Sequence, residues 1–182
     1  MAGPTIMAHG TDEQKGRYLQ PLLAADEIWC QGFSEPGAGS DLAGVRTSAR
    51  LDGDRFVLNG QKVWSSYAHI ADFCILLTRS DPDSERHEGL TYMVVDMHAP
   101  GVEVRPLTQI TGEAEFNEIF FANAEVPVEN VLGEIGGGWR VAMTTLLHER
   151  GTLGFALVAR LEVQMRKLLA LARDRGASPT QR

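Results

Sequence analysis

Three consecutive glycines, Gly136 to Gly138, separate two parts of this sequence that follow different hydrophobic periods. From about residue 28 to 132, short apolar runs alternate with turn residues, which is typical of strands. From Trp139 to about Arg175, apolar residues recur every three or four positions, which predicts one long helix, about 50 Å in length, that Gly176 ends. Because the chain contains no other element of that length, we expect the helix to expose an apolar stripe unless another subunit, or a further part of a larger protein, covers it.

The strand-forming part predicts a β-barrel or sandwich, because several short strands are separated by turn signals. Asn59-Gly60 lies between two apolar runs, and since this dipeptide accepts positive φ at both turn positions, it predicts a two-residue hairpin. The apolar run 73–78 is typical of a strand buried on both faces, whereas residues 80–89 are polar and charged, as in an exposed loop. Further strands are expected at 90–96, 102–107 and 118–121.

A short helix is expected from residue 11 to about 24. Thr11 is a good N-cap, Gln14 completes a capping box, and Pro21 is expected to end or bend the helix. The predicted fold is therefore an α+β multidomain fragment, in which a central antiparallel β-barrel or sandwich is flanked by a short N-terminal helix and a long C-terminal helix. The expected boundaries are 1–27, 28–135 and 136–182.

Charge and composition exclude some classes of partner. The formal net charge is −7 and no block of Lys or Arg occurs, which argues against nucleic acid and against a membrane surface. No apolar run is long enough to span a bilayer, and residues 1–10 resemble neither a signal peptide nor a transit peptide. Cys30 and Cys74 form no Cys-x-x-Cys pair, so we expect reduced core thiols, a cytoplasmic location and no metal site.

The most informative stretch runs from Trp29 to Asp41 and reads WCQGFSEPGAGSD. It is expected to turn sharply at Pro36-Gly37 and again at Gly39. Glycines let the backbone approach a bulky ligand and let N–H groups converge on an anion, while the serines of this stretch add hydroxyl donors. A bare Gly-x-Gly is more often a turn in a surface loop, so the longer pattern has to decide.

That longer pattern, SEPGAGSD at 34–41, resembles the signature of the acyl-CoA dehydrogenase family. The segment 59–66, NGQKVWSS, looks like the second flavin motif of that family, and 89–96 resembles its next core strand. Segments 10–23 and 116–143 resemble the end of its N-terminal helical domain and the passage into its C-terminal one. The match covers nearly the whole chain, in order, and implies a longer, three-domain subunit.

Members of this family bind FAD and oxidise acyl-CoA thioesters to trans-2-enoyl-CoA, so the resemblance implies an FAD cofactor and an acyl-CoA substrate. It implies that Gln31, Phe33 and Ser34 line the isoalloxazine, with Ser34 donating near N1 and the C2 carbonyl. Fixed donors there favour hydride acceptance, because reduced flavin carries negative charge at that edge. Gln31 departs from the pattern, since aromatic or aliphatic residues are frequent at its position.

The remaining cofactor contacts are implied in the same way. Gly39 and Ser40 would approach the FAD phosphates, and Ser40 would also meet the CoA chain. Trp64 would pack against the ring system, although a strand core residue is the ordinary interpretation of a lone Trp. Ser66 would hydrogen-bond near N5, and it keeps the hydroxyl of the Thr that is common there.

The reaction of the family needs a carboxylate that removes the α-proton while the β-hydride goes to flavin N5, and a dry site raises the pKa of such a base. In most members this Glu lies in a part of the fold outside this chain. Some members, including isovaleryl-CoA dehydrogenase, carry it on the first long C-terminal helix, where Glu149 stands here. Arg150 matches an arginine that organises the substrate side. A solvated helix residue is the alternative for Glu149, and His148 is expected to be a bystander.

Several alternatives remain open from the sequence. The chain is expected to need further helices to close its pocket, so residues 1–182 alone should hold FAD weakly or not at all and should have negligible dehydrogenase activity. We expect a homo- or hetero-oligomer, the tetramer being usual in the family, with electron-transferring flavoprotein as electron acceptor. A truncated or split subunit that needs a partner chain is one alternative. A related flavin monooxygenase or nitroalkane oxidase on the same fold is another, because sites and not folds decide function.

Overall fold

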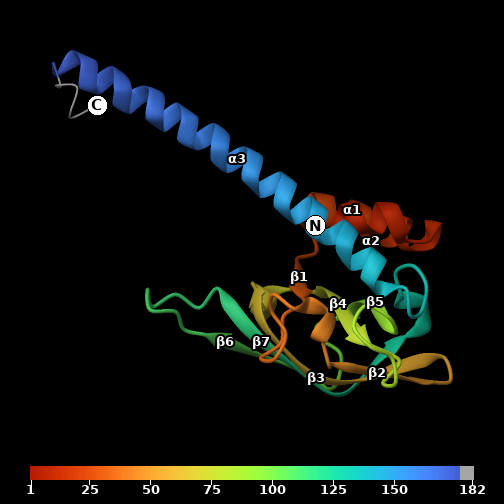
Figure 1. Cartoon of the computed structure of the whole chain (residues 1–182). Coiled ribbons are helices and arrows are strands. Elements are labelled where there is room, and N and C mark those ends of the chain that lie inside the picture. Colours follow the sequence, from red (N-terminus) through yellow and green to blue (C-terminus); the bar gives the residue numbers. More distant parts are fainter. Residues whose placement is uncertain (177–182) are drawn as a thin grey trace. The chain divides into compact units, whose positions relative to one another are not determined.

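The computed structural model describes residues 1–176, except for the side chains of 152 and 153, and forms two compact units, Met1–Thr145 and Leu146–Arg182. Residues 177–182, the end of the predicted C-terminal piece, lie outside the described residues. The first unit contains two helices, seven strands and the start of a third helix (Figure 1). The elements are α1 (Ala2–His9), α2 (Asp12–Ala24), β1 (Trp29–Gly32), β2 (Ser48–Asp52), β3 (Arg55–Ser66), β4 (Phe73–Arg79), β5 (Leu90–Asp96), β6 (Val102–Leu107), β7 (Phe116–Pro127) and α3 (Gly138–Asp174).

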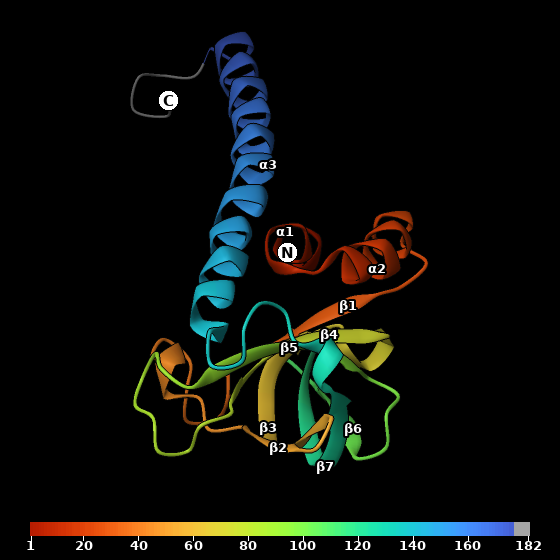
Figure 2. The ribbon, with the colours of Figure 1, turned by 90° about the vertical axis from the view of Figure 1, so that its right-hand side faces the viewer.

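The strands form one curled mixed sheet in the order β1-β4-β2-β3-β7-β6, and β5 pairs with β4 (Figure 2). The predicted fold class is confirmed, with helices flanking a β domain. Most strand pairs are antiparallel, as predicted, but β1 and β2 both run parallel to β4. The parallel pairing arises because β1 enters the sheet directly from the helices, and no hairpin joins it to its neighbour.

The structure confirms both the predicted buried strand and the predicted exposed loop. β4 is buried along its whole centre, and the segment after it, residues 80–89, is mainly exposed. The core inside the curl is built from side chains of β3, β4, β5 and β7, with Phe56, Leu76, Met93, Val95 and Ile119 each no more than 1% exposed. β7 is longer than predicted, and β1 and β2 were not predicted as strands.

The hairpin predicted at Asn59-Gly60 is wrong. β3 runs through both residues, and the turn instead lies between β2 and β3, where Asp52 pairs with Arg55. Gly60 has a φ of +149°, and a Cβ there would stand 2.7 Å from the Thr47 Cα, so the glycine allows the start of β2 to approach β3. The register shifts at Asn59, which marks a β-bulge rather than a turn.

The N-terminal region is more helical than predicted. The capping box of α2 is confirmed, because the Thr11 hydroxyl accepts from Gln14 N and the Gln14 side chain accepts from Thr11 N. Pro21 does not end the helix, which continues to Ala24. Residues 2–9, for which no element was predicted, form α1, and Figures 1 and 2 both show α1 and α2 on the same side of the sheet.

The long helix begins at Gly138, close to the predicted residue. A Cβ at Gly138 would lie 2.7 Å from Tyr92 N, so this glycine lets the first turn of α3 touch the β5 backbone. In the second unit, α3 exposes the predicted apolar side chains, among them Leu157, Leu161 and Met165. No helix within residues 1–176 is both long and apolar enough to cross a membrane.

Candidate functional site

The segment after β1 forms a tight, backbone-bonded turn, which confirms the turn predicted at Pro36-Gly37. Glu35 N donates to Ala38 O at 2.8 Å, and Ala38 N donates to Glu35 O at 3.1 Å. Pro36 and Gly37 are exposed at the tip. We call residues 33–38 the ledge. Ser34 lies on it half-buried, between the buried Phe33 and Glu35.

Trp64 is exposed on β3 in a strained conformation. Its φ is +63°, which L-residues with bulky side chains rarely adopt, and its side chain is 62% exposed. The strain accompanies a second bulge, because the pairing with β7 skips from Lys62 to Ser65. The indole meets the ring of Phe116 edge-on, with centroids 6.1 Å apart. A strained, exposed aromatic residue of this kind is typical of a binding surface.

One backbone hydrogen bond joins the ledge to β3 beside this tryptophan. Val63 N donates to Ser34 O at 2.9 Å, so Ser34 and Trp64 come from segments distant in sequence and lie next to each other. Ser66 follows on the exposed side of β3, two residues beyond Trp64. The structure thus brings together three of the predicted contact residues.

The other predicted residues lie nearby in the chain but differ in exposure. Gln31 pairs with Ile75 and is half-buried on β1, whereas Gly39 and Ser40 are exposed immediately after the ledge. Asp41 next forms an ion pair with Arg86, at 3.3 Å. Within the described part of the chain, no hydrogen bond engages the hydroxyl of Ser34, Ser40 or Ser66, so these donors remain available to a ligand.

The ledge is anchored by a buried ion pair that sequence reasoning missed. The Lys62 ammonium lies 2.8 Å from Glu35 Oε1, with side-chain exposures of 0% and 8%. Lys62 also donates to Phe33 O at 3.1 Å. The signal was available in the period-2 alternation of β3, because Lys62 is in phase with Phe56 and Leu58 on the core face.

The protonation of this pair follows from its surroundings. Burial alone raises the pKa of Glu35, but the charge of Lys62 and donors from Lys62, Thr47 and Arg46 outweigh it and hold the pKa below its ordinary value. Burial lowers the pKa of Lys62, and the Glu35 carboxylate opposes that shift. Glu35 is therefore ionised at neutral pH, and its carboxylate favours the charged form of the Lys62 ammonium beside it.

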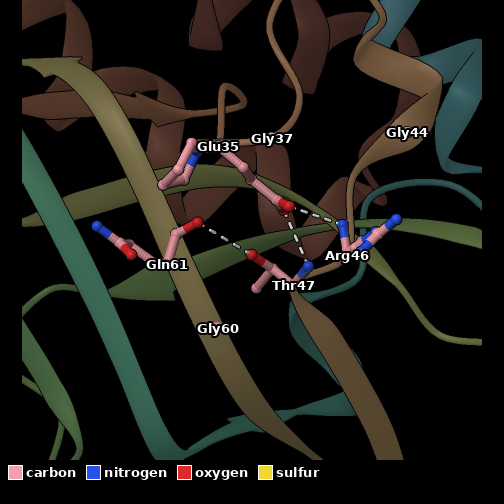
Figure 3. A pocket seen from close by; sticks show the side chains of 8 residues that line it. Glu35, Gly37, Gly44, Arg46, Thr47, Gly60 and Gln61 are labelled. Atoms are coloured by element: carbon pink, nitrogen blue, oxygen red, sulfur yellow. Dashed lines mark hydrogen bonds between the residues drawn. The ribbon is translucent and has the colours of Figure 1, made fainter.

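A cavity of about 350 Å³ opens on the other side of the ledge (Figure 3). Its walls come from the ledge, from the residues that lead into β2 and from the middle of β3. Glu35 reaches across it, since its carboxylate accepts from Arg46 N at 2.7 Å and from Thr47 N at 2.9 Å. The lining residues are Glu35, Pro36, Gly37, Gly44, Arg46, Thr47, Gly60 and Gln61.

A network of buried hydroxyls lies behind Phe33. Thr145 Oγ1 is 2.8 Å from Tyr92 OH and 2.8 Å from Thr5 Oγ1, which connects α3, β5 and α1. Burial raises the pKa of Tyr92, whose ring packs edge-on against Phe33 at 5.8 Å. This network was not predicted, because its three residues are far apart in sequence.

Glu149 and Arg150 lie in the second unit, as consecutive residues of α3. The helix predicted to carry them is present, and the role of Glu149 as the base stays a prediction. No group of three or more His, Cys, Asp or Glu side chains within residues 1–176 is placed to hold a metal ion.

Known proteins match this chain over nearly its whole length. Residues 30–124 match the model of the acyl-CoA dehydrogenase middle domain. This chain belongs to the acyl-CoA dehydrogenase family. An acyl-CoA dehydrogenase of Mycobacterium tuberculosis, IpdE1, is 51% identical over 98% of this chain. The matched region is 46% of IpdE1, so the chain spans about half the length of such a relative.

Solved structures of acyl-CoA dehydrogenases have the same fold. A chain described as the Tcur3481-Tcur3483 steroid ACAD G363A variant matches with a TM-score of 0.90 and 39% identity, over 98% of this chain and 47% of its own length. A chain of the ChsE4-ChsE5 complex from Mycobacterium tuberculosis matches with a TM-score of 0.75 and 40% identity, over 81% of this chain and 38% of its own.

Proposed function

We propose that the first unit of this chain is the flavin-side wall of an acyl-CoA dehydrogenase active site. The observation that carries the proposal is the pairing of Ser34 with the residue before Trp64, through the 2.9 Å bond from Val63 N to Ser34 O. This bond places the Ser34 hydroxyl beside the exposed indole of Trp64. Together they form a flat apolar surface with a hydrogen-bond donor at its edge. A flavin has the matching shape, a flat ring system with hydrogen-bond acceptors along one edge.

The residues present fit FAD by their chemistry. The hydroxyls of Ser34, Ser40 and Ser66 are donors that no internal bond occupies within the described residues, and a Cβ added at Gly39 would meet no atom within 4 Å. Ser34 and Ser66 would hold the polar edge of the ring, and Trp64 would cover its face. Gly39 and Ser40 would hold phosphates, while Phe33 and Gln31 line the inner side. When bound, FAD supplies the acceptor for a hydride from the acyl β-carbon.

We propose Glu149 as the base that takes the α-proton and Arg150 as the residue that orients the thioester side. Both lie on the helix that the family uses for the alternative base position, and they are consecutive in the sequence. The competing hypothesis is a carboxylate outside this chain.

The substrate class is proposed from the relatives. Two solved chains with 39% identity are described as steroid acyl-CoA dehydrogenases, so a CoA thioester attached to a steroid-type ring system is the first candidate. Straight and branched acyl-CoAs are the alternatives. The binding of any of them depends on walls that lie outside the first unit.

The assembly is proposed on similar grounds. Two of the matching structures are described by pairs of different chains, which supports a hetero-oligomer that completes the pocket. In the three-domain scheme, residues 1–27, 28–135 and 136–182 supply the end of one helical domain, the β domain and the start of the next. Electron-transferring flavoprotein is the proposed acceptor, and a cytoplasmic location stays a prediction.

The test is anaerobic reduction of the flavin in the assembled protein that contains this chain. Addition of steroid-derived, branched and straight acyl-CoAs should bleach the oxidised flavin band, fastest with the steroid-derived thioester. Subsequent exposure to oxygen should reoxidise it slowly, because a dehydrogenase passes its electrons to a protein. An assembly that binds no FAD, or that none of these thioesters reduces, would refute the proposal.

Rapid reoxidation by oxygen, with turnover, would instead favour a flavin monooxygenase or oxidase. The same assay on residues 1–182 alone should show neither retained FAD nor reduction. A partner chain that restores both would support the split-subunit arrangement.

A further inference from the structure

We propose that the buried ion pair of Glu35 and Lys62 is a positioning device that sets the hydroxyl of Ser34 against the flavin edge. The inference rests on the proposed function, because it assigns a role to residues that support the flavin wall without touching the ligand. Neither residue is among the proposed contacts. Both are buried, and together they connect three segments of the chain.

Lys62 holds the ledge on both sides of Ser34. Its ammonium donates to the carbonyl of Phe33 at 3.1 Å and to the carboxylate of Glu35 at 2.8 Å. The next residue of β3, Val63, donates its N–H to the carbonyl of Ser34 itself. Three successive residues of the ledge are therefore bound to two successive residues of β3, which fixes the rotation of the peptide that carries the Ser34 side chain.

Glu35 extends the same network to a third segment. Its carboxylate accepts from the backbone N–H groups of Arg46 and Thr47, at 2.7 Å and 2.9 Å. Figure 3 shows these bonds reaching from the ledge to the residues that lead into β2. One carboxylate thus receives three donors, from side chain and backbone, and has only one geometry that satisfies all of them.

Packing does not supply the same restraint. The ledge borders the cavity of about 350 Å³, and its tip residues Pro36 and Gly37 are exposed. Packing holds the two ends of the ledge, where Phe33 and Ala38 are buried, but the side of the ledge that faces the cavity is held by directed bonds. Because a buried ion pair is often replaceable by apolar residues without loss of stability, its value here lies in orientation.

The experiment compares variants of equal chemical size. Glu35→Gln keeps the shape but removes the charge opposite Lys62, and it replaces one of the two acceptor oxygens with an NH2 group that cannot accept from a backbone N–H. The control is Glu125→Gln, which makes the same change in an exposed ion pair with Arg55 of β3, where the Nη1–Oε2 distance is 2.6 Å. A third variant, Glu35→Leu with Lys62→Met, removes both charges together, so that no lone charge stays buried.

The first readout needs no flavin and uses hydrogen exchange on the full chain. In Glu35→Gln we expect the amides of Arg46, Thr47 and Val63 to exchange at least about tenfold faster, because the bonds that order them are lost. Amides of β4 and β5 should exchange faster only by the factor that corresponds to the global loss of stability, measured by urea denaturation of the same variant. In Glu125→Gln all of these amides should keep their wild-type rates. Unchanged exchange at residues 46, 47 and 63 would overturn the inference.

The second readout uses the assembly that contains this chain, reconstituted with FAD. Glu35→Gln should weaken FAD binding at least about tenfold and shift the flavin absorption band, since the donor at the ring edge is displaced. The doubly apolar variant should regain thermal stability without regaining affinity or the wild-type band. If that variant restores both, the pair is only structural and the inference fails.

The two proposals fail in distinguishable ways. If the wild-type assembly binds no FAD, the proposed function is wrong, while the exchange result still decides whether the pair orders the ledge. If Glu35→Gln unfolds, as lost protection in β4 and β5 would show, Glu35→Asp decides instead. That variant keeps the negative charge but has a side chain one methylene shorter. It should speed hydrogen exchange at Arg46, Thr47 and Val63 alone. Wild-type rates at these three amides would contradict the positioning role of the ion pair.

Discussion

The rings of Trp64 and Phe116 meet at 82°, with their centroids 6.1 Å apart, and this edge-on contact supports an indole that is otherwise exposed. The contact explains how a tryptophan with a φ of +63° is held in one orientation on the open face of β3. Strained backbone residues cluster at binding and active sites, which is why we interpret the φ of Trp64 as a binding feature.

Two substitutions of Trp64 separate strain from binding. Trp64→Ala and Trp64→Gly should both weaken FAD binding by at least about tenfold, because base-like rings lose about 1–3 kcal/mol when a stacking aromatic is removed. The glycine variant should be the more stable of the two by about 1 kcal/mol, since only glycine adopts this φ without strain. Flavin titration and urea denaturation measure the two quantities. Equal stability of the variants would contradict the strain interpretation.

Glu149→Gln tests the proposed base. In the flavin-loaded assembly we expect turnover to fall by at least about a thousandfold, while the flavin spectrum stays unchanged, because the amide cannot take the α-proton. Stopped-flow reduction by an acyl-CoA measures the step directly. Near-normal activity would remove Glu149 from consideration and point to a carboxylate outside this chain.

The hydroxyl network behind Phe33 predicts unequal costs for its members. Tyr92→Phe removes an end of the network and should cost about 1 kcal/mol of unfolding free energy, since Thr5 and Thr145 still bond each other at 2.8 Å. Thr145→Val removes the central hydroxyl and leaves two buried hydroxyls without it, so it should cost about 1–3 kcal/mol. Urea denaturation of both variants decides the order, and a larger loss for Tyr92→Phe would contradict the network.

The loss of unfolding free energy at acidic pH should depend on Glu35. Its folded pKa lies below the ordinary value, so its contribution is fully present above the pKa of the unfolded chain, about 4.3, and is lost as the pH falls through the folded pKa. Glu35→Gln should lower stability at neutral pH by about 3–5 kcal/mol, because it leaves Lys62 buried without its partner charge. Stability measured from pH 7 to 3 should then fall less steeply in the variant than in the wild type. Parallel curves would contradict the assignment.

Two glycines predict opposite effects of the same substitution. Gly60→Ala should destabilise by about 2–3 kcal/mol, because the added Cβ meets the Thr47 backbone and the φ of +149° is strained for alanine. Gly16→Ala, inside α2 with no atom within 4 Å of the new Cβ, should stabilise by about 0.5–1 kcal/mol. Thermal denaturation of the pair is the measurement, and equal effects would show that neither environment matters.

Local features of the fold were accessible to sequence reasoning. The capping box at Thr11 and Gln14, the buried strand β4 and the start of α3 at Gly138 all depend on neighbours within a few residues. The same holds for the turn at Pro36-Gly37, which closes on itself through backbone bonds. The residue types at the predicted flavin positions were readable too, although their roles remain proposals.

The wrong and missing predictions concern residues whose conformation depends on pairing with a strand distant in sequence. Asn59-Gly60 favours a hairpin by itself, but pairing with β7 draws both residues into a continuous strand, and Asn59 instead binds Asn123 across the bulge, at 3.0 Å and 3.1 Å. In the sequence, Glu35 and Lys62 belong to two separate motifs, and nothing local indicates that they touch. The sheet brings them together as a buried ion pair, with Lys62 Nζ 2.8 Å from Glu35 Oε1. Sequence by itself thus determined the family pattern and the elements whose signals are local. Only the tertiary structure decided register, bulges and the buried pair, because their energies come from contacts between residues far apart in the chain.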